Sequence, residues 1–285
     1  MQLTFMAQNL EFGGLRDGEG TMRDRWPLLV KRITAVDPKP DFLLLSEAEG
    51  WDKYGHRYLS RAANELDMDA LFSSSQNGQG VVLLYRRETV GRWQRWNADY
   101  TEQVTHSFGV GSFDVGLPSL LSVVPVHLDP FRIEKALSEI GLITSRGYRY
   151  GPFGVIGGDL NYASSRGPEP EYSEMKPYNI AARTVHGDPT EEQELRPDRR
   201  IGWALEKADY VDVAYHLSEQ TGDESLLQRT ARSDRIDQFW VTKPLAPAIT
   251  SYEVVDTPAD ASDHKGIVFG LDTEKVDSSV AMEYT

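Results

Sequence analysis

Short apolar runs alternate with amphipathic segments along most of the chain, and this pattern predicts alternating strands and helices. Residues 3–10 are predicted to form a first strand, and residues 42–45 form a continuous apolar run of the kind buried on both faces. Residues 153–156 form a third run, short enough to be a buried strand. Further strands are predicted over residues 81–86, 90–96, 113–126 (one or two strands), 210–213, 235–241, 251–255 and 267–270.

Helices are predicted where apolar residues recur at helical spacing. One begins near Trp26, because Pro27 suits a first helical turn. Another follows residue 129, with Asp129 as its N-cap and Pro130 at its first position. Two more are predicted over residues 56–66 and 201–207.

The apolar strands need helices on one side and another sheet on the other, which predicts a layered α/β domain. No internal repeat or low-complexity linker divides residues 1–271, so we expect a single domain. Residues 162–200 depart from the pattern, with five prolines, many charges and little periodicity, and are predicted to be a long surface excursion. Residues 272–285 are polar and predicted to be a frayed C-terminal tail.

Composition narrows the functional classes. The chain has no cysteine, which excludes disulfides, thiolate metal sites and a cysteine nucleophile and is compatible with the cytoplasm that we expect as its location. No signal peptide is visible, and no apolar stretch approaches the roughly 18 residues of a membrane span. The formal charge of −14 disfavours broad, non-specific binding to phosphate backbones, although a local basic rim would still serve. The oligomeric state is left open.

Polar side chains collect where the predicted strands end. Asp159 and Asn161 follow one apolar run and would project from the same side of an extended chain. Each such residue has an ordinary alternative role as a turn former, a solvated carboxylate or a salt-bridge partner. Their shared position favours a functional site, because active sites of layered α/β proteins collect at strand ends. The residues that share it are Asn9, Glu47, His127, Asp159, Asn161, Asp237, Asp263 and His264.

This set contains the groups that metal-assisted phosphoester hydrolysis needs. Glu47, with Asp263 and Asn9, offers hard oxygen ligands that suit Mg²⁺ or Mn²⁺. Such an ion would neutralise charge on the phosphoryl oxygens and help the leaving oxygen to depart.

The remaining residues suit proton transfer and phosphate binding. Asp159 is a candidate acceptor for a proton of the attacking water, and Asn161 with one histidine could donate hydrogen bonds to transition-state oxygens. Asp237 is a candidate partner that fixes the tautomer of His264.

Six short motifs carry a family resemblance, and they cover nearly the whole chain from residue 4 to residue 270. The chain resembles the endonuclease/exonuclease/phosphatase superfamily, which includes pancreatic-type deoxyribonuclease, abasic-site endonucleases, neutral sphingomyelinases and inositol polyphosphate phosphatases. The motifs occur in family order: Gln8-Asn9-Leu10, Asp41 through Glu47, Val126-His127-Leu128, Gly158-Asp159-Leu160-Asn161, Asp234-Arg235-Ile236-Asp237 and Ser262-Asp263-His264.

The resemblance implies a deoxyribonuclease-like four-layer α/β sandwich, with two packed mixed β-sheets flanked by helices. It implies that Glu47 is the metal carboxylate, with Asn9 close by and Asp263 at the metal. Ser46 replaces the glutamine that usually precedes the glutamate, which weakens inferences about residues around the metal but not about the ligand itself.

The resemblance also assigns catalytic roles. Asp159 would orient or deprotonate the nucleophilic water, and Asn161 would help to hold the phosphate. Asp237 would orient a catalytic His264. His127 matches the histidine that contacts the phosphate or protonates the leaving group in the deoxyribonuclease and sphingomyelinase branches, and it argues against the abasic-site branch, where a tyrosine is common.

The leading hypothesis is a divalent-metal phosphoesterase with phosphodiesters of nucleic acid as the default substrate. Arginines and tryptophans are mixed within residues 86–96, as on single-strand binding surfaces, and Arg232 and Arg235 could contact a phosphate. Both clusters have a solvated surface as their ordinary alternative. The rival is a phosphatase or phosphodiesterase for a soluble metabolite or lipid headgroup, and the third is a non-catalytic binding module that kept the fold.

Overall fold

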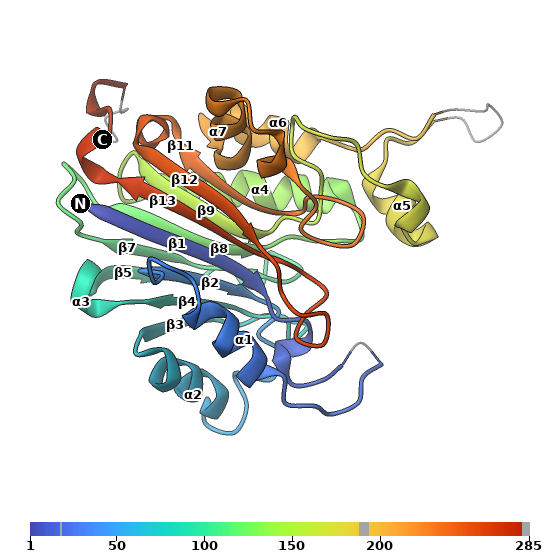
Figure 1. Cartoon of the computed structure of the whole chain (residues 1–285), viewed down its shortest axis with the longest axis horizontal. Coiled ribbons are helices and arrows are strands. Elements are labelled where there is room, and N and C mark those ends of the chain that lie inside the picture. The colour runs from blue at the N-terminus through green and yellow to red at the C-terminus, as the bar shows by residue number, and fades with distance from the viewer. Residues whose placement is uncertain (18, 188–193, 281–285) are drawn as a thin grey trace.

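Two mixed β-sheets pack face to face in the computed structural model, which describes residues 1–17, 19–187 and 194–280 (Figure 1). The six-stranded sheet has the order β12 (Ile249–Val255), β13 (Gly266–Asp272), β1 (Gln2–Asn9), β2 (Phe42–Ser46), β4 (Val81–Tyr85), β3 (Asp69–Ser73). The seven-stranded sheet has the order β10 (Tyr210–Asp212), β11 (Asp237–Thr242), β9 (Phe153–Asp159), β8 (Leu121–His127), β7 (Val110–Phe113), β5 (Trp93–Asn97), with β6 (Ser107–Phe108) paired to β8. The pairs β1–β2 and β8–β9 are parallel, whereas the other pairs are antiparallel.

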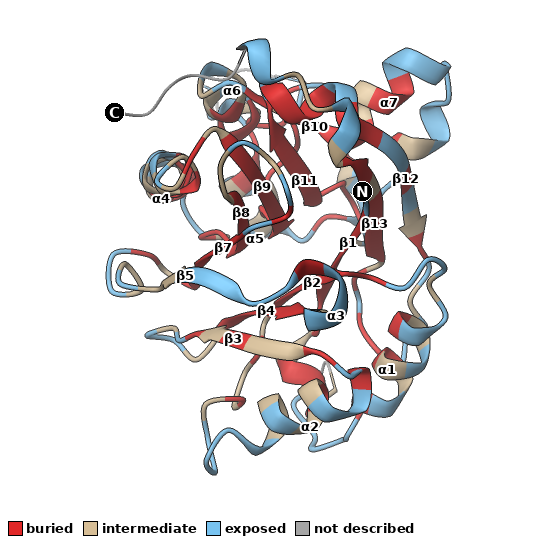
Figure 2. Ribbon diagram, turned by 90° about the vertical axis from the view of Figure 1, so that its left-hand side faces the viewer, coloured by how far each residue is buried: buried red, intermediate tan, exposed pale blue. Residues whose placement is uncertain are grey.

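Helices cover the outer face of each sheet. Helices α1 (Trp26–Thr34) and α2 (Arg57–Leu66) pack on the six-stranded sheet, through a buried cluster that includes Trp26, Leu29 and Ile33. Helices α4 (Ile133–Gly147) and α6 (Arg200–Lys207) pack on the seven-stranded sheet. Figure 2 shows the resulting order of helices, sheet, sheet and helices. The predicted four-layer α/β sandwich is confirmed.

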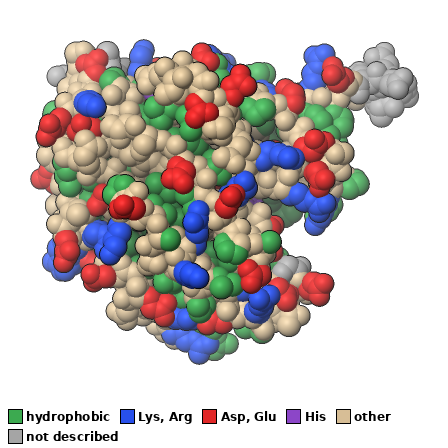
Figure 3. Space-filling model, in the orientation of Figure 1, with side chains coloured by type: hydrophobic (Ala, Val, Ile, Leu, Met, Phe, Trp, Pro, Cys, Tyr) green, Lys and Arg blue, Asp and Glu red, His purple; other side chains and the backbone are tan. Residues whose placement is uncertain are grey.

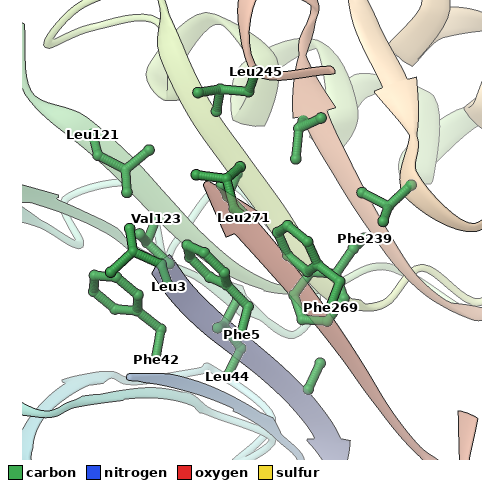
Figure 4. Close-up of a cluster of buried hydrophobic side chains, with 14 of the residues drawn as sticks. Leu3, Phe5, Phe42, Leu44, Leu121, Val123, Phe239, Leu245, Phe269 and Leu271 are labelled. Atoms are coloured by element: carbon green, nitrogen blue, oxygen red, sulfur yellow. The ribbon is translucent and has the colours of Figure 1, made fainter. Parts of the chain in front are cut away.

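The layer between the sheets is the main core, and alternation along each strand builds it. Leu3 and Phe5 of β1 point into this layer, whereas Met6 points to the opposite face, beneath the helices. The Phe5 ring stacks on Phe269 of β13, with 4.6 Å between centroids, and Phe42 of β2 meets Phe113 of the other sheet edge-on at 4.8 Å. Figure 4 shows Phe5, Phe42 and Phe269 among aliphatic side chains of both sheets. Burial of this apolar surface therefore fixes how the two sheets face each other.

Two glycines let β9 pass through the crowded centre of the molecule. A Cβ on Gly157 would lie 2.2 Å from the Phe239 ring, and one on Gly158 would lie 2.2 Å from the Val126 carbonyl oxygen. Gly158 also has a φ of 138°, which side chains disfavour. These glycines thus serve close packing of strands just before Asp159.

The strand directions bring the polar strand ends to one edge of the sandwich. Strands β1, β2, β8 and β9 all end there, and the antiparallel strands β11 and β13 begin there. This edge lies on the right-hand side of Figure 1, between helix α5 (Pro177–Arg183) and the loop that follows β1.

Several predicted element boundaries were wrong. The strand predicted over residues 90–96 starts only at Trp93, because helix α3 (Arg87–Val90) precedes it and Gly91, with a φ of 70°, separates the two. Helix α4 begins at Ile133 rather than Pro130, because Asp129 Oδ1 accepts the backbone N–H groups of Phe131 and Arg132 and caps a turn before the helix. Strand β3 and helix α7 (Val213–Thr221) were not predicted.

The excursion over residues 162–200 carries more structure than its sequence indicated. It contains α5, a short 3₁₀ helix at Tyr172–Glu174 and a bridge between Thr184 and Pro197, while residues 188–193 lie outside the described residues. In the described part of the predicted tail, Thr273–Lys275 and Ser278–Val280 form 3₁₀ turns and Val276 packs against the core, so this part is not frayed. Residues 281–285 lie outside the described residues. Within the described ranges, none of the helices has the length and apolar character needed to cross a bilayer.

Candidate active site

Asp159 lies at the centre of the polar cluster, at the C-terminal end of β9. Its Oδ1 accepts the backbone N–H of Asn161 at 2.8 Å, and its Oδ2 accepts the Asn9 side-chain amide at 3.0 Å. The Nε2 atoms of His127 and His264 lie 3.7 and 3.9 Å from the same Oδ2. The carboxylate is buried. Its four neighbours, Asn161, Asn9, His127 and His264, surround it and fix its position.

Glu47 approaches Asp159 from the other sheet, just beyond the end of β2. Its backbone is left-handed, with a φ of 57°, a conformation that is uncommon for a residue with a side chain and often found at functional sites. Its Oε2 accepts the backbone N–H of Phe12 at 3.0 Å, and its Oε1 accepts the Asn9 amide at 3.1 Å. Burial raises the pKa of Glu47, although the hydrogen bond from Phe12 opposes this. A bound cation would favour the ionised form.

The carboxylates fit a divalent cation. Glu47, His127 and Asp159 each offer one ligand atom, and these atoms lie within 4.8 Å of one another; Asp159, Asp237 and His264 form a second such group. Carboxylate oxygens are the preferred ligands of Mg²⁺ and Mn²⁺. Asn9 Nδ2 links the carboxylates of Glu47 and Asp159 where their like charges would otherwise repel.

Two residues predicted at the metal are placed differently. The Asn9 oxygen, which would be its ligand atom, accepts the Glu11 backbone N–H at 2.9 Å, so Asn9 presents its amide nitrogen to the carboxylates. Asp263 is exposed and belongs to neither ligand group. Both residues border the site, but neither is placed as a direct ligand.

His264 and Asp237 form a buried pair. His264 Nδ1 lies 2.7 Å from Asp237 Oδ2, which leaves Nε2 directed towards Asp159. Burial disfavours the charged imidazole, but the charge of Asp237 and its hydrogen bond outweigh burial and raise the pKa of His264 well above its usual value. The pairing with Asp237 therefore favours the protonated form of His264.

His127 is neutral, in contrast to His264. Burial, followed by the charges of His264 and Arg183, lowers the pKa of His127 to about 3. Its ring stacks on His106, with 3.9 Å between centroids and 9° between planes. His106 was not identified from the sequence, where it lies alone between predicted strands; Asn77 Nδ2 contacts its Nδ1 at 2.9 Å. The surroundings of the two histidines nearest Asp159 thus shift their pKa values in opposite directions.

Asn161 is held by a residue that sequence analysis missed. Its backbone has a φ of 61°, and its Nδ2 donates to the Leu128 carbonyl at 3.0 Å. Arg183, at the end of α5, donates from Nη2 to Asn161 Oδ1 at 2.8 Å. The excursion therefore reaches the site through a buried guanidinium.

Comparison with solved structures identifies the fold. An endonuclease/exonuclease/phosphatase protein from Bacteroides vulgatus matches with a TM-score of 0.63 and 13% identity, over 95% of this chain and 99% of that one. The chain has the endonuclease/exonuclease/phosphatase fold. An abasic-site (AP) endonuclease from Archaeoglobus fulgidus matches with a TM-score of 0.60 and 15% identity, over 95% and 99% of the two chains. The endonuclease domain of TRAS1, a telomere-specific non-LTR retrotransposon, matches with a TM-score of 0.59 and 15% identity, over 96% and 100%. A scan against protein-family models and a search of curated proteins gave no match.

In this endonuclease/exonuclease/phosphatase fold, the two arginines predicted to bind phosphate, Arg235 and Arg232, differ in their exposure to solvent. Arg235 is buried and its Nη1 donates to Asp212 Oδ1 at 3.2 Å, so the structure places it as an ion-pair partner of Asp212, and its contact with a phosphate stays a prediction. Arg232 is exposed, and its Nε donates a hydrogen bond to Glu174 Oε2 at 2.7 Å. It lines a groove that is also lined by Asp263 and His264. Figure 3 shows the surface hollowed on its right-hand side, between the α5 segment and the loop after β1.

The arginine–tryptophan cluster of residues 86–96 lies away from the site, towards the opposite ends of the strands that carry the site residues. Trp93 pairs with Phe113, which in turn pairs with Leu121, the first residue of β8, whereas the site residue His127 is the last. Tyr85 likewise pairs with Phe42, the first residue of β2. The predicted nucleic-acid surface therefore lies over the half of the strands that is farther from the candidate site.

Proposed function

We propose that the protein is a divalent-metal-dependent hydrolase of phosphoester bonds. The observation that carries the proposal is the convergence of Glu47, His127 and Asp159, with ligand atoms within 4.8 Å of one another, beside the buried Asp237–His264 pair. This set combines hard oxygen ligands, a proton acceptor and an imidazolium, which are the groups that hydrolysis of a phosphate ester uses.

Glu47, with Asp159 beside it, is the carboxylate proposed to hold Mg²⁺ or Mn²⁺. When bound, the ion would polarise the phosphoryl group and neutralise charge on the leaving oxygen. Asn9, which donates to both carboxylates, would set the distance between them.

The charges of the surrounding residues support separate roles. Asp159 Oδ2, which is near both imidazoles, is proposed to accept a proton from the attacking water. The oxygen of that water forms a bond to phosphorus while the bond between phosphorus and the leaving oxygen breaks. The cationic His264, held by Asp237, would stabilise negative charge on the phosphoryl oxygens. His127 is neutral, which favours a hydrogen bond to the phosphate over protonation of the leaving group.

Phosphodiesters of nucleic acid are the proposed substrate. Two of the similar structures are endonucleases, one an abasic-site enzyme and one a retrotransposon domain. Arg232, in the groove beside His264, supports a contact with a neighbouring phosphate.

A phosphatase or phosphodiesterase for a small phosphorylated metabolite or lipid headgroup is the second candidate. The formal charge of −14 and the distance of the residue 86–96 cluster from the site both favour a substrate that needs only a local positive pocket. A non-catalytic binding module ranks below both, because Glu47 and His264 are present and lie at the site.

A substrate panel tests the proposal. Single-stranded and double-stranded DNA, RNA, bis(p-nitrophenyl) phosphate and a set of phosphomonoesters would be incubated with the protein and Mg²⁺, Mn²⁺ or EDTA. The proposal expects hydrolysis with either metal and none with EDTA. DNA cleavage without phosphate release from the monoesters would reject the metabolite phosphatase, and metal-independent or absent hydrolysis across the panel would reject the phosphoesterase.

A further inference from the structure

Arg183 is the only residue of α5 that is buried, although the excursion to which it belongs lies mostly on the surface. Its side chain is 10% exposed, and it extends away from the end of the helix towards the end of β9. A buried arginine needs compensating partners, because desolvation of an unpaired guanidinium is unfavourable. The partners that it finds are residues of two sequence motifs at the candidate site.

The guanidinium connects those two motifs. Nη2 donates to Asn161 Oδ1 at 2.8 Å, whereas Nη1 lies 3.3 and 3.5 Å from the two oxygens of Asp234. Asp234 is itself buried and stands three residues before Asp237. One side chain from the excursion therefore bridges the loop after β9 and the segment that leads into β11.

The contact with Asn161 fixes the direction of its carboxamide. With Oδ1 turned to Arg183, the amide nitrogen must face the Leu128 carbonyl, to which it donates at 3.0 Å. A flipped amide would place N–H groups against the N–H groups of Arg183 and an oxygen against the Leu128 carbonyl oxygen, so both neighbours disfavour it. The amide nitrogen carries a second hydrogen beyond the one that Leu128 accepts.

The same arrangement reaches Asp159. The Asn161 backbone N–H donates to Asp159 Oδ1 at 2.8 Å, and Asn161 adopts a left-handed backbone, with a φ of 61°, in order to do so. Ordering of the Asn161 side chain by Arg183 thus stabilises the loop conformation that holds the Asp159 carboxylate.

We propose that Arg183 is a positioning residue for phosphoester hydrolysis, which acts through Asn161 by holding its amide donor towards the phosphate. The excursion is then an integral part of the active site. This inference rests on the proposed function, because it assigns the part that Arg183 has in that reaction.

Arg199 provides a matched control. It also anchors the excursion, through hydrogen bonds from its guanidinium to the carbonyls of Ser164, at 2.6 Å, and Gly167, at 3.2 Å, and within the described residues its other partners, Pro168 and Glu169, are not residues of the site either. Replacing either arginine with glutamine removes an anchor of the excursion, whereas only the Arg183 change releases Asn161.

The test measures kcat and KM with bis(p-nitrophenyl) phosphate and Mn²⁺. Arg183→Gln is expected to lower kcat about 10- to 100-fold with a smaller change in KM, as loss of a residue that orients an active-site group does. Arg199→Gln should keep kcat near the wild-type value. In an Asn161→Ala background, Arg183→Gln should cause little further loss, because its effect passes through Asn161.

Arg183→Lys guards against unfolding of the glutamine variant. It keeps a buried cation beside Asp234 but cannot span two acceptors as a guanidinium does, so it should fold and still lose most of the same activity. Full activity in Arg183→Lys or Arg183→Gln, or an equal loss in the presence and absence of the Asn161 side chain, would overturn the inference. Failure of wild type and Arg199→Gln alike to hydrolyse any substrate of the panel would instead reject the proposed function, and this inference with it.

Discussion

Replacement of Asp159 with asparagine separates catalysis from folding at this site. The new side chain has nearly the same shape, and its oxygen keeps the acceptor position for the Asn161 backbone N–H, now 2.8 Å away. Its NH₂ group takes the place of Oδ2, which accepts Asn9 at 3.0 Å in the native protein, so two donors would face each other there. The carboxylate that accepts the proton is lost.

The magnitude follows from these contacts. Loss of a well-placed acid–base group lowers the rate at least about 100-fold, which corresponds to about 2.7 kcal/mol of activation free energy. The lost hydrogen bond to a charged group destabilises the fold by about 1.5–3 kcal/mol, but removal of the like charge beside Glu47 offsets part of this. We therefore expect the free energy of unfolding to change by less than about 2 kcal/mol.

The assay compares kcat on the best substrate of the panel with urea unfolding of the same samples. Asp114→Asn is the control, because Asp114 is exposed and lies beyond β7 at the opposite end of the sandwich. A folded Asp159→Asn protein with a near-normal rate would refute the role assigned to Asp159.

Three further outcomes follow from the geometry. Gly158→Ala should destabilise the protein by about 3 kcal/mol in urea unfolding, because its Cβ would meet the Val126 carbonyl oxygen at 2.2 Å. Gly55 also has a positive φ, of 66°, but nothing lies within 4 Å of its Cβ position, so Gly55→Ala should lower the free energy of unfolding by only about 1 kcal/mol. Equal losses in the two variants would contradict the packing argument. Asp237→Asn removes the main cause of the raised pKa of His264. The stability that protonated His264 contributes is present below its unfolded pKa of about 6.5 and is lost as the pH rises through its higher folded pKa. The loss of stability in Asp237→Asn should therefore grow as the pH falls from about 9 to 5.5, and a difference independent of pH would count against the pair. EDTA should abolish hydrolysis and added Mn²⁺ should restore it, while unchanged activity in EDTA would exclude a metal requirement.

The sequence predicted those parts of the fold that depend on local pattern. The short apolar runs that became β1, β2 and β9 have a strand-like local pattern, and the polar residues at their ends, Asn9, Glu47 and Asp159, do meet. The order of the antiparallel strands has no such local signal. The residue 86–96 cluster was therefore given a role at a site that lies at the other end of its strands.

Arg183 and His106 show why the rest of the site was missed. Arg183 acts through its contact with Asn161, which lies 22 residues away along the chain. It stands in a proline-rich stretch, where Pro177 at a helix start was the only local indication of structure. His106 reaches the site only because β6 pairs with β8 and brings its ring onto His127. The ion pair of Arg235 with Asp212 likewise could not be predicted, because Asp212 lies 23 residues away along the chain.

Titration of Mn²⁺ into the protein, followed by the loss of the paramagnetic resonance signal of the free ion, tests most directly whether Glu47 holds a metal at this site. The account predicts saturable binding by the wild-type protein and at least about tenfold weaker binding by Glu47→Gln, because a carboxylate ligand for a hard cation is lost. Equal affinity in the two proteins, or no binding by either, would contradict it.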